Sequence, residues 1–447
     1  MLQANPINPT KSYRPVNREI LKLAVPNIIS NISVPLLSSV DTALMGQLSA
    51  LHIGAVGVGA MLFNFIYWNF GFLRMGTTGI TAQSYGQQSD VAIILTLGRA
   101  LFIALLLAIL IMLLQVPFAE MGFTLMNLSA TQLPLVSTYF YIRIWAAPAT
   151  LALYALMGWF FGMQNAIYPL ILTITINVVN IICSLFFIKY MGFEVAGVAY
   201  GTVIAQYVGL FLGVGLFFYK YHSLLPHLNQ KALLKWEELQ QFLSINSDIF
   251  IRTFCLTFVF GFFYSQSSVG GEQLLAVNVI LLQFLNWMSY GVDGFAFATE
   301  SLVGKYVGAK QQLQLNKAIK LSFIWAMGLA GLYSLLYGGL GMSLVGVFSN
   351  QAAVITATQP YLFWMVLFPL LSTPCYIWDG IFIGLTASRA MRDSMILSLF
   401  IYLGVHYLLK DDFGNHGLWL ALLVFVVARG GIQWWIYRQR KLGELVN

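Results

Sequence analysis

Runs of about twenty apolar residues recur along the whole chain, separated by short stretches that hold glycine, proline and charge. A helix of about 20 apolar residues is long enough to cross the hydrocarbon core of a bilayer. The pattern predicts twelve such helices, near residues 20–47, 51–80, 92–117, 133–160, 166–189, 195–220, 240–265, 272–300, 315–340, 354–386, 393–410 and 415–437. The predicted fold class is therefore an all-α polytopic membrane protein.

Residues 228–244, LNQKALLKWEELQQFLS, differ from these runs because charged and apolar positions are mixed at helical spacing. Such a segment favours a helix that lies along the membrane interface. Since it falls near the middle of the chain, we expect it to join two halves. These are an N-terminal six-helix lobe at 1–221, a cytoplasmic linker with an interfacial amphipathic helix at 222–238, and a C-terminal six-helix lobe at 239–447.

An internal repeat supports this division. A shift of 222 residues aligns LYALMGWFFGMQNA at 153–166 with CYIWDGIFIGLTAS at 375–388, and AQSYGQQ at 82–88 with GKYVGAK at 304–310. The repeat predicts two pseudo-symmetric bundles related by an axis along the membrane normal, an arrangement in which transporters rock one bundle against the other. Channels also contain repeats, so the pattern favours transport without establishing it.

Composition and charge agree with a membrane location. Hydrophobic residues make up 59% of the 447 positions and charged residues 9%, whereas soluble proteins carry about 25% charged residues. With the N-terminus placed inside, sixteen of the 23 lysines and arginines lie in inner segments and two in outer loops, which predicts that both termini are cytoplasmic. This bias explains the net charge of +7 without nucleic-acid binding.

Asp41 is the most informative polar residue of the apolar runs. An ionised carboxylate near the middle of a membrane helix costs roughly 2.5–3.5 kcal/mol on insertion scales, so it indicates a functional site. Counting from the helix ends puts Ser184 of the fifth helix and Thr202 of the sixth at the depth of Asp41, with Asn180 slightly deeper. One ionisable group among neutral oxygens is what a proton or small-cation site requires.

The neutral members of this set also have a simpler interpretation. Asn, Gln, Ser and Thr side chains commonly hydrogen-bond between membrane helices without a further role. This alternative stands for Asn177, Asn180, Ser184, Thr202 and Gln206.

Two prolines, Pro26 and Pro35, lie in the same helix as Asp41. Each removes a backbone donor and permits a kink, so protonation of Asp41 could be linked to helix shape; a static kink is the alternative. Arg143 lies about ten residues into the fourth helix from the outside and needs a partner, for which Asp41 is a candidate.

The second half also carries charges within its helices. Asp248 and Arg252 are spaced i, i+4, which favours an ion pair between them. Asp293, Glu300 and Asp379 fall near inner helix ends, where they either line an inward-open vestibule that attracts cations or are solvated at the interface. No catalytic or metal-ligand spacing and no nucleotide-binding loop occurs, so we expect neither an enzyme nor a cofactor, and transport energy would come from an ion gradient.

Several stretches together resemble one family of transporters. They are LAVPNIISNISVPLLSSVDTALMGQL at 23–48, FLRMGTTGITAQSYG at 72–86, RIWAAPATLALYALMGWFFGMQ at 143–164, SINSDIFIRTF at 244–254 and DGFAFATESLVGKYVGA at 293–309. The combination is similar to the multidrug and toxic compound extrusion (MATE) family, in its DinF-like branch. The resemblance implies two six-helix lobes around a cavity and export of amphipathic, often cationic compounds against an H⁺ or Na⁺ gradient.

The resemblance also implies roles for individual residues. The acid of the family's first helix corresponds to Asp41, its helix-bending proline to Pro26 and its sixth-helix threonine to Thr202. In the family's Asn-x-x-x-Asp pattern of the fifth helix, Asn180 matches but Ser184 replaces the aspartate. A single carboxylate binds a proton more readily than it holds a desolvated Na⁺, so H⁺ coupling is favoured, with Na⁺ at Asp41 as the alternative.

A flippase for a lipid-linked precursor, from the wider superfamily, is a further alternative. It would need a strongly cationic cavity for phosphates, and the few arginines inside helices argue against it. The expected setting is the bacterial inner membrane, where the protein would act as a monomer in contact with lipids and small-molecule substrates.

Overall fold

The computed structural model describes residues 14–46, 50–126 and 128–439, and in these ranges the chain forms helices and turns without strands. The first half contains α1 (Arg14–Gly46), α2 (Ala50–Asn69), α3 (Phe72–Gly86), α4 (Asp90–Leu113), α5 (Gln115–Leu125), α6 (Leu133–Arg143), η1 (Ile144–Ala146), α7 (Ala147–Gly162), α8 (Ile167–Lys189), α9 (Glu194–Tyr221) and η2 (His222–His227). The second half contains α10 (Gln230–Leu233), α11 (Trp236–Val269), α12 (Glu272–Gly308), α13 (Gln312–Phe348), α14 (Ala352–Thr358), η3 (Gln359–Tyr361), α15 (Leu362–Gly384) and α16 (Ser388–Gln439).

Ten helical segments of the described chain are long and apolar enough to cross a membrane. Consecutive helices form one segment in four cases: α2 with α3, α6 with α7, α9 with η2, and α14 with α15. The 52-residue α16 contains a non-helical residue, Gly414 (φ 50°, ψ −125°), and so consists of two arms. If α16 counts as two spans and α1, 33 residues long, as one more, the number reaches the predicted twelve.

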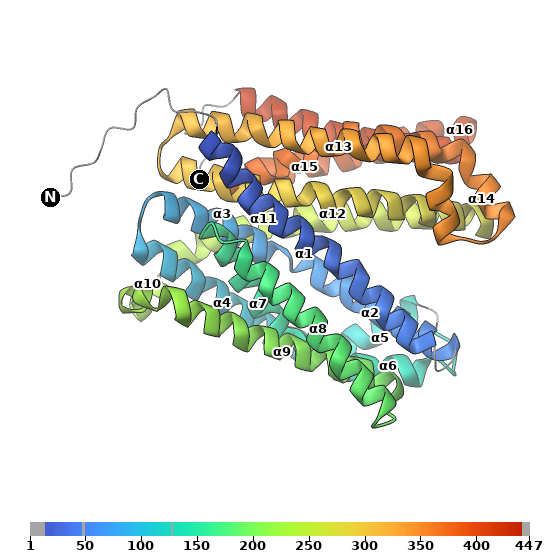
Figure 1. The fold of residues 1–447 in the computed structure, drawn as a ribbon, viewed down its shortest axis with the longest axis horizontal. Helices are drawn as coiled ribbons and strands as arrows, with labels where there is room; N and C mark the ends of the chain where they lie inside the picture. The colour runs from blue at the N-terminus through green and yellow to red at the C-terminus, as the bar shows by residue number, and fades with distance from the viewer. Residues whose placement is uncertain (1–13, 47–49, 127, 440–447) are drawn as a thin grey trace.

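The helices form two bundles, with α2–α9 in one and α11–α16 in the other, while α1 runs diagonally between them (Figure 1). The bundles converge where α3, α12 and α15 end, and they diverge toward the opposite end (Figure 1). We call the first of these the converged end.

The backbone repeats at the shift of 222 residues that the sequence indicates. In the described chain the non-glycine residues with positive φ are Gln88, Gln164, Lys310 and Thr386. They form two pairs at this shift, Gln88 with Lys310 (φ 57° and 54°) and Gln164 with Thr386 (φ 59° and 54°). Since few non-glycine residues adopt a positive φ, this match confirms that the two bundles are pseudo-symmetric.

Helices α3 and α12 cross at the converged end through two equivalent contacts. A Cβ added at Gly86 would lie 2.0 Å from the carbonyl oxygen of Lys305, and one added at Gly308 would lie 2.0 Å from that of Gln83. The two contacts are related by the same shift of 222. Because a residue with a Cβ cannot allow this approach, the crossing depends on both glycines.

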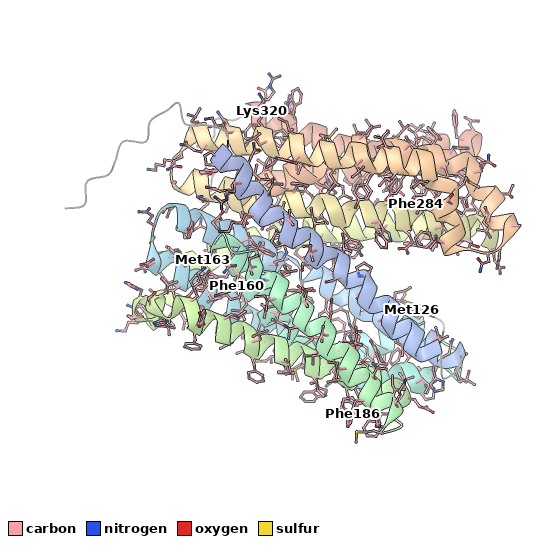
Figure 2. The ribbon with its side chains drawn as sticks, viewed as in Figure 1. Met126, Phe160, Met163, Phe186, Phe284 and Lys320 are labelled. Carbon is pink, nitrogen blue, oxygen red and sulfur yellow. The ribbon has the colours of Figure 1, made fainter. Side chains whose placement is uncertain are left out.

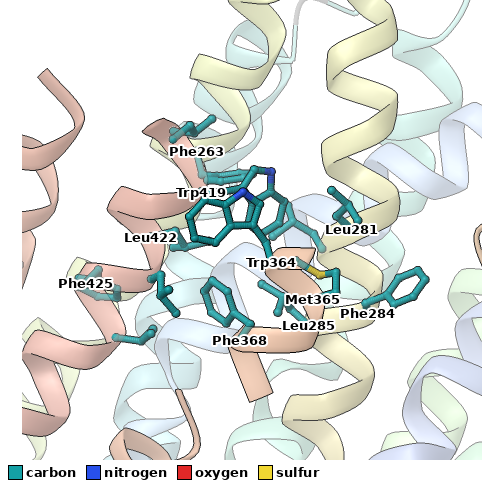
Figure 3. Packing of buried hydrophobic residues seen from close by; sticks show 14 of the residues in the cluster. Phe263, Leu281, Phe284, Leu285, Trp364, Met365, Phe368, Trp419, Leu422 and Phe425 are labelled. Carbon is teal, nitrogen blue, oxygen red and sulfur yellow. The ribbon is translucent and has the colours of Figure 1, made fainter. Parts of the chain in front are cut away.

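Each bundle has an apolar core, and apolar side chains also cover the outside of the molecule (Figure 2). In the second bundle Trp419 packs among Phe263, Trp364 and Phe368, with its ring 4.9 Å from that of Phe263 (Figure 3). On the outside, Phe186 of α8 is 50% exposed, which suits a surface that faces lipid.

Helix α1, which precedes the first bundle, begins against the second bundle, and α11, which opens the second bundle, begins against the first. Val16 and Ile20 of α1 belong to a core cluster formed mainly by α12, α13 and α15. Conversely, Phe242 and Ile245 of α11 belong to the core of the first bundle. The cores are therefore shared between the two halves of the chain, and the predicted lobe limits remain a prediction.

The amphipathic segment 228–244 does not form one separate interfacial helix. It divides at the extended residue Lys235 into the four-residue α10 and the first turns of α11, which continues to Val269. Arg99 of α4 attaches this connection to the first bundle: its Nη2 donates to the carbonyl oxygen of Ala232 at 2.9 Å, and its Nη1 lies 3.4 Å from Glu238 Oε2. The amphipathic pattern arises because the start of α11 packs on the first bundle.

Candidate functional site

Three of the predicted site residues meet between α8 and α9. Asn180 and Ser184 lie on α8 and Thr202 lies on α9, and all three are buried. Asn180 Nδ2 donates to Thr202 Oγ1 at 2.9 Å, and Thr202 Oγ1 donates to the carbonyl oxygen of Val198 at 3.0 Å. Gly201 lets the helices approach closely, because a Cβ there would lie 2.5 Å from Ser184 Oγ. The structure therefore brings Asn180, Ser184 and Thr202 together.

This cluster holds two oxygen atoms without partners. Neither Asn180 Oδ1 nor Ser184 Oγ has a hydrogen-bond partner among the described residues. A buried polar group left unsatisfied costs about 1–3 kcal/mol, so such a group usually has a function or an additional ligand. Both atoms can accept a hydrogen bond, and both can coordinate a small cation.

Helix α1 packs along α8, next to this cluster. Ser30 Oγ donates to Thr173 Oγ1 at 2.9 Å, and Asn177 Nδ2 donates to Ser33 Oγ at 3.1 Å. Residue 41 belongs to α1, but the side chain of Asp41 lies outside the described residues. The proximity of Asp41 to the cluster therefore remains a prediction.

The other predicted residues of the first bundle take separate positions. Helix α1 is continuous through Pro26 and Pro35. Gln206 is half-buried, one turn beyond Thr202 on α9. Arg143 donates to the Tyr139 hydroxyl.

In the second bundle the predicted ion pair between Asp248 and Arg252 is wrong. Asp248 instead accepts hydrogen bonds from Arg392 Nη1 at 2.6 Å and from Ser388 Oγ at 2.8 Å, both on α16. Arg252 pairs with Asp379 of α15. An i, i+4 pair contributes only about 0.2–0.5 kcal/mol, so partners on neighbouring helices override it.

Asp379 is the centre of a buried charged cluster. It pairs with Arg252 and lies 3.3 Å from Arg429 Nη2, and its Oδ1 accepts a hydrogen bond from Gln433 Nε2 at 2.8 Å. Asp379 is 7% exposed and Glu300 1%, so neither is solvated at the interface in this structure, and their place in an inward-open vestibule stays a prediction. Sequence reasoning missed Arg429 and Gln433; the signal available for Arg429 was its charge inside an apolar run.

Arg74 of α3 and Glu300 of α12 form a further ion pair, and this one joins the two bundles. Arg74 Nη1 lies 3.7 Å from Glu300 Oε2. Asp293, seven residues before Glu300 on the same helix, is half-buried and interacts electrostatically with Arg74 and Asp379. The structure thus collects Asp293, Glu300 and Asp379 near arginines that balance their charge.

A cavity of about 430 Å³ lies near the converged end, between α3, α4 and the start of α11. Polar and charged side chains line much of it, including Gln83, Gln87, Thr96, Arg99 and Glu238. It does not include the cluster of Asn180, Ser184 and Thr202. The two cations that line it, Arg99 and Lys235, are paired with Glu238 and Glu237, so the cavity contributes no strongly cationic site.

Two pseudo-symmetric bundles of membrane-spanning helices, with charged and polar side chains buried between them, are the architecture of a secondary transporter. The MatE family model matches residues 26–186 and again residues 249–410. The chain is 34% identical over 416 residues to DNA damage-inducible protein F of Escherichia coli (strain K12), covering 93% of this chain and 90% of that protein. It is 22% identical over 428 residues to a probable multidrug resistance protein NorM of Acinetobacter baylyi, with coverage of 91% and 92%.

A solved structure agrees with these relatives. An outward-facing conformation of a multidrug resistance MATE family transporter of the MOP superfamily matches with a TM-score of 0.87 and 18% sequence identity, over 98% of this chain and 100% of that one. The chain belongs to the MATE family, in its DinF-like branch. It is a multi-pass inner-membrane transporter of an efflux family and not an enzyme.

Proposed function

We propose that this chain is a secondary active antiporter that exports amphipathic, often cationic compounds in exchange for H⁺, with Asp41 as the coupling carboxylate. The observation that carries the proposal is a pair of buried oxygens, Asn180 Oδ1 and Ser184 Oγ, which have no partner among the described residues and lie on the helix along which α1 packs. Relatives described as multidrug resistance proteins support the class of substrate.

The choice of H⁺ follows from the chemistry of the four residues proposed to form the site. Asp41 supplies one formal charge, while Asn180, Ser184 and Thr202 are neutral. A protonated carboxyl donates one hydrogen bond, and either oxygen without a partner can accept it. A Na⁺ ion would lose its hydration shell and would need several oxygens in its place, which one carboxylate supplies less readily.

The proposed cycle is alternating access. When the protein faces outward, Asp41 takes a proton, α1 bends near Pro26 and Pro35, and the bound compound leaves. When it faces inward, the proton leaves and a new compound enters from the cytosol or the inner leaflet. The distribution of lysine and arginine predicts that both termini are cytoplasmic, so the converged end would be the inner one.

The test uses purified full-length protein in liposomes and follows a fluorescent cationic dye under a pH gradient alone or a Na⁺ gradient alone. We expect export driven by the pH gradient in the parent and its loss in Asp41→Asn. Asp90→Asn is the matched control, because Asp90 is an exposed acid of the same bundle. It should export as the parent does.

The alternatives give different results in the same assay. Export driven only by Na⁺ would contradict proton coupling and would make the oxygens of Asn180, Ser184 and Thr202 part of a cation site. Unchanged export by Asp41→Asn would remove Asp41 from the mechanism. No export under either gradient would favour the lipid-linked precursor flippase, for which the arginines of the second bundle give weak support because Asp379 lies beside Arg252 and Arg429.

A further inference from the structure

The converged end is held by hydrogen bonds between the bundles as well as by the glycine crossing. Gln83 Nε2 of α3 donates to the carbonyl oxygen of Gly384 at 2.9 Å. Gln164 Nε2, just after α7, donates to the carbonyl oxygen of Ser301 on α12 at 2.8 Å. Both bonds join the first half of the chain to the second, so opening this end must break them.

The ion pair of Arg74 and Glu300 belongs to the same contact but lies deeper in the molecule. Glu300 precedes Gly308 by eight residues, which is about 12 Å along α12 from the crossing. The side chains of Arg74 and Glu300 are 12% and 1% exposed. The Arg74 guanidinium also lies 4.0 Å from the centre of the Phe297 ring on α12. Arg74 therefore contacts the opposite bundle through a charge and through an aromatic ring.

This pair lacks the hydrogen bonds that stabilise other buried charges of the protein. Arg74 Nη1 and Glu300 Oε2 lie 3.7 Å apart, beyond hydrogen-bond distance, and the hydroxyl of Thr78 beside Glu300 donates to the carbonyl oxygen of Arg74 at 2.9 Å. Asp248, by contrast, accepts hydrogen bonds from Arg392 and Ser388 within one bundle. A buried ion pair offsets the desolvation of its charges only with good geometry and further hydrogen bonds. Arg74 and Glu300 would therefore gain from hydration.

We propose that Arg74 and Glu300 are positioning residues of the transport cycle, which pair across the bundles when the converged end is closed and separate into water when it opens. The inference rests on the alternating access of the proposed function and names the side chains whose separation favours opening. A conformational balance responds only to interactions that differ between its states, and this pair differs in both charge contact and hydration. Two apolar residues in its place would hold the closed state more firmly.

Neighbouring charges determine how a single substitution acts. Arg252 and Arg429 are already engaged with Asp379, so they are poorly placed to compensate Glu300 when Arg74 is lost. Asp293 interacts electrostatically with Arg74, so it partly compensates Arg74 when Glu300 is lost. We expect Arg74→Met to have the larger effect.

The test measures the distance between spin labels at Gln87 and Gln312, exposed positions beside the ends of α3 and α13 at the converged end. Double electron–electron resonance on the full chain in nanodiscs gives the ratio of closed to open populations, in a background where alanine replaces Cys183, Cys255 and Cys375. Arg74→Met should lower this ratio by about tenfold or more, because an uncompensated buried charge disfavours the closed state. Glu300→Gln should lower it less, and the double variant Arg74→Met/Glu300→Leu should raise it above the parent value and slow transport.

The matched control is Arg392→Met, which breaks an ion pair within one bundle and should leave the ratio unchanged. Parent-like ratios in both single variants, with a lowered melting temperature, would show a purely structural pair and overturn the inference. A double variant whose closed-to-open ratio falls by the combined effect of the two single substitutions would also overturn it. If the parent exports dye but shows one fixed distance between the two labels, the inference is overturned while antiport still holds. A parent that exports no dye contradicts the proposed function, while the ratios still decide the role of this pair.

Discussion

The crossing of α3 and α12 gives the sharpest prediction about the conformational balance. In Gly86→Ala the new Cβ would lie 2.0 Å from the carbonyl oxygen of Lys305, whereas ordinary contact begins at 3.4 Å, so the two backbones must move apart by 1.4 Å. Overpacking of this kind costs typically about 1–3 kcal/mol. The cost falls on the closed state alone, since the contact is absent when this end opens. A bias of this size lowers the closed-to-open ratio by about 5- to 150-fold.

The assay is the distance measurement between labels at the converged end, combined with dye export. We expect Gly86→Ala to populate the open state and to export slowly, because the cycle cannot return to the closed arrangement. Gly308→Ala should reproduce the effect, since its Cβ meets Gln83 in the symmetry-related contact. Gly328→Ala in α13 is the control, because a Cβ there meets nothing within 4 Å. A ratio within about twofold of the parent in Gly86→Ala would refute the reasoning.

Three further substitutions test other parts of the structure. Arg99→Met removes the hydrogen bond to Ala232, which is worth about 1.5–3 kcal/mol for a charged donor. Limited proteolysis should therefore cut the connection between α10 and α11 faster. An unchanged rate would contradict the attachment of this connection to α4. Ser184→Ala removes a hydroxyl that has no partner among the described side chains, so the melting temperature should stay within about 2 °C while H⁺-driven export falls; unaltered export would exclude this hydroxyl from the site. Gly414→Ala forces φ 50°, ψ −125° on a residue with a Cβ and should destabilise the protein by about 1–3 kcal/mol. Gly404→Ala in the same helix is the control and should not, because a Cβ there meets nothing within 4 Å. Equal thermal stability of the two variants would show that α16 tolerates the change at Gly414.

The contact among Asn180, Ser184 and Thr202 in the first bundle could be predicted from the sequence. Depth in a membrane follows from residue count, because a helix rises by about 1.5 Å per residue. Asn180 and Thr202 lie at similar depth on consecutive antiparallel helices joined by a short turn, which favours contact, and they do share a hydrogen bond. Asp41 follows the same argument, but its pairing with this cluster remains a prediction.

The charged clusters of the second bundle could not be found in this way. Arg252 and Asp379 are 127 residues apart in sequence, and Asp379 and Gln433 are 54 apart. Depth alone leaves open which helices are neighbours and which face of each helix turns inward. The i, i+4 spacing of Asp248 and Arg252 suggested a local pair, but lateral packing gave each residue a partner on a different helix.

The sequence by itself determined the helices, the repeat and the membrane location of this MATE-family chain. A bilayer requires long apolar helices, and repeated segments fold alike because they carry the same pattern of apolar and small residues. Only the tertiary structure decided that α1 and α11 each begin against the opposite bundle, that α3 and α12 cross at paired glycines, and that Arg74 meets Glu300 between the bundles. These contacts depend on which helices are neighbours around the pseudo-symmetry axis. Hydropathy and helical rise report the depth of a residue in the membrane and carry no information about its lateral neighbours.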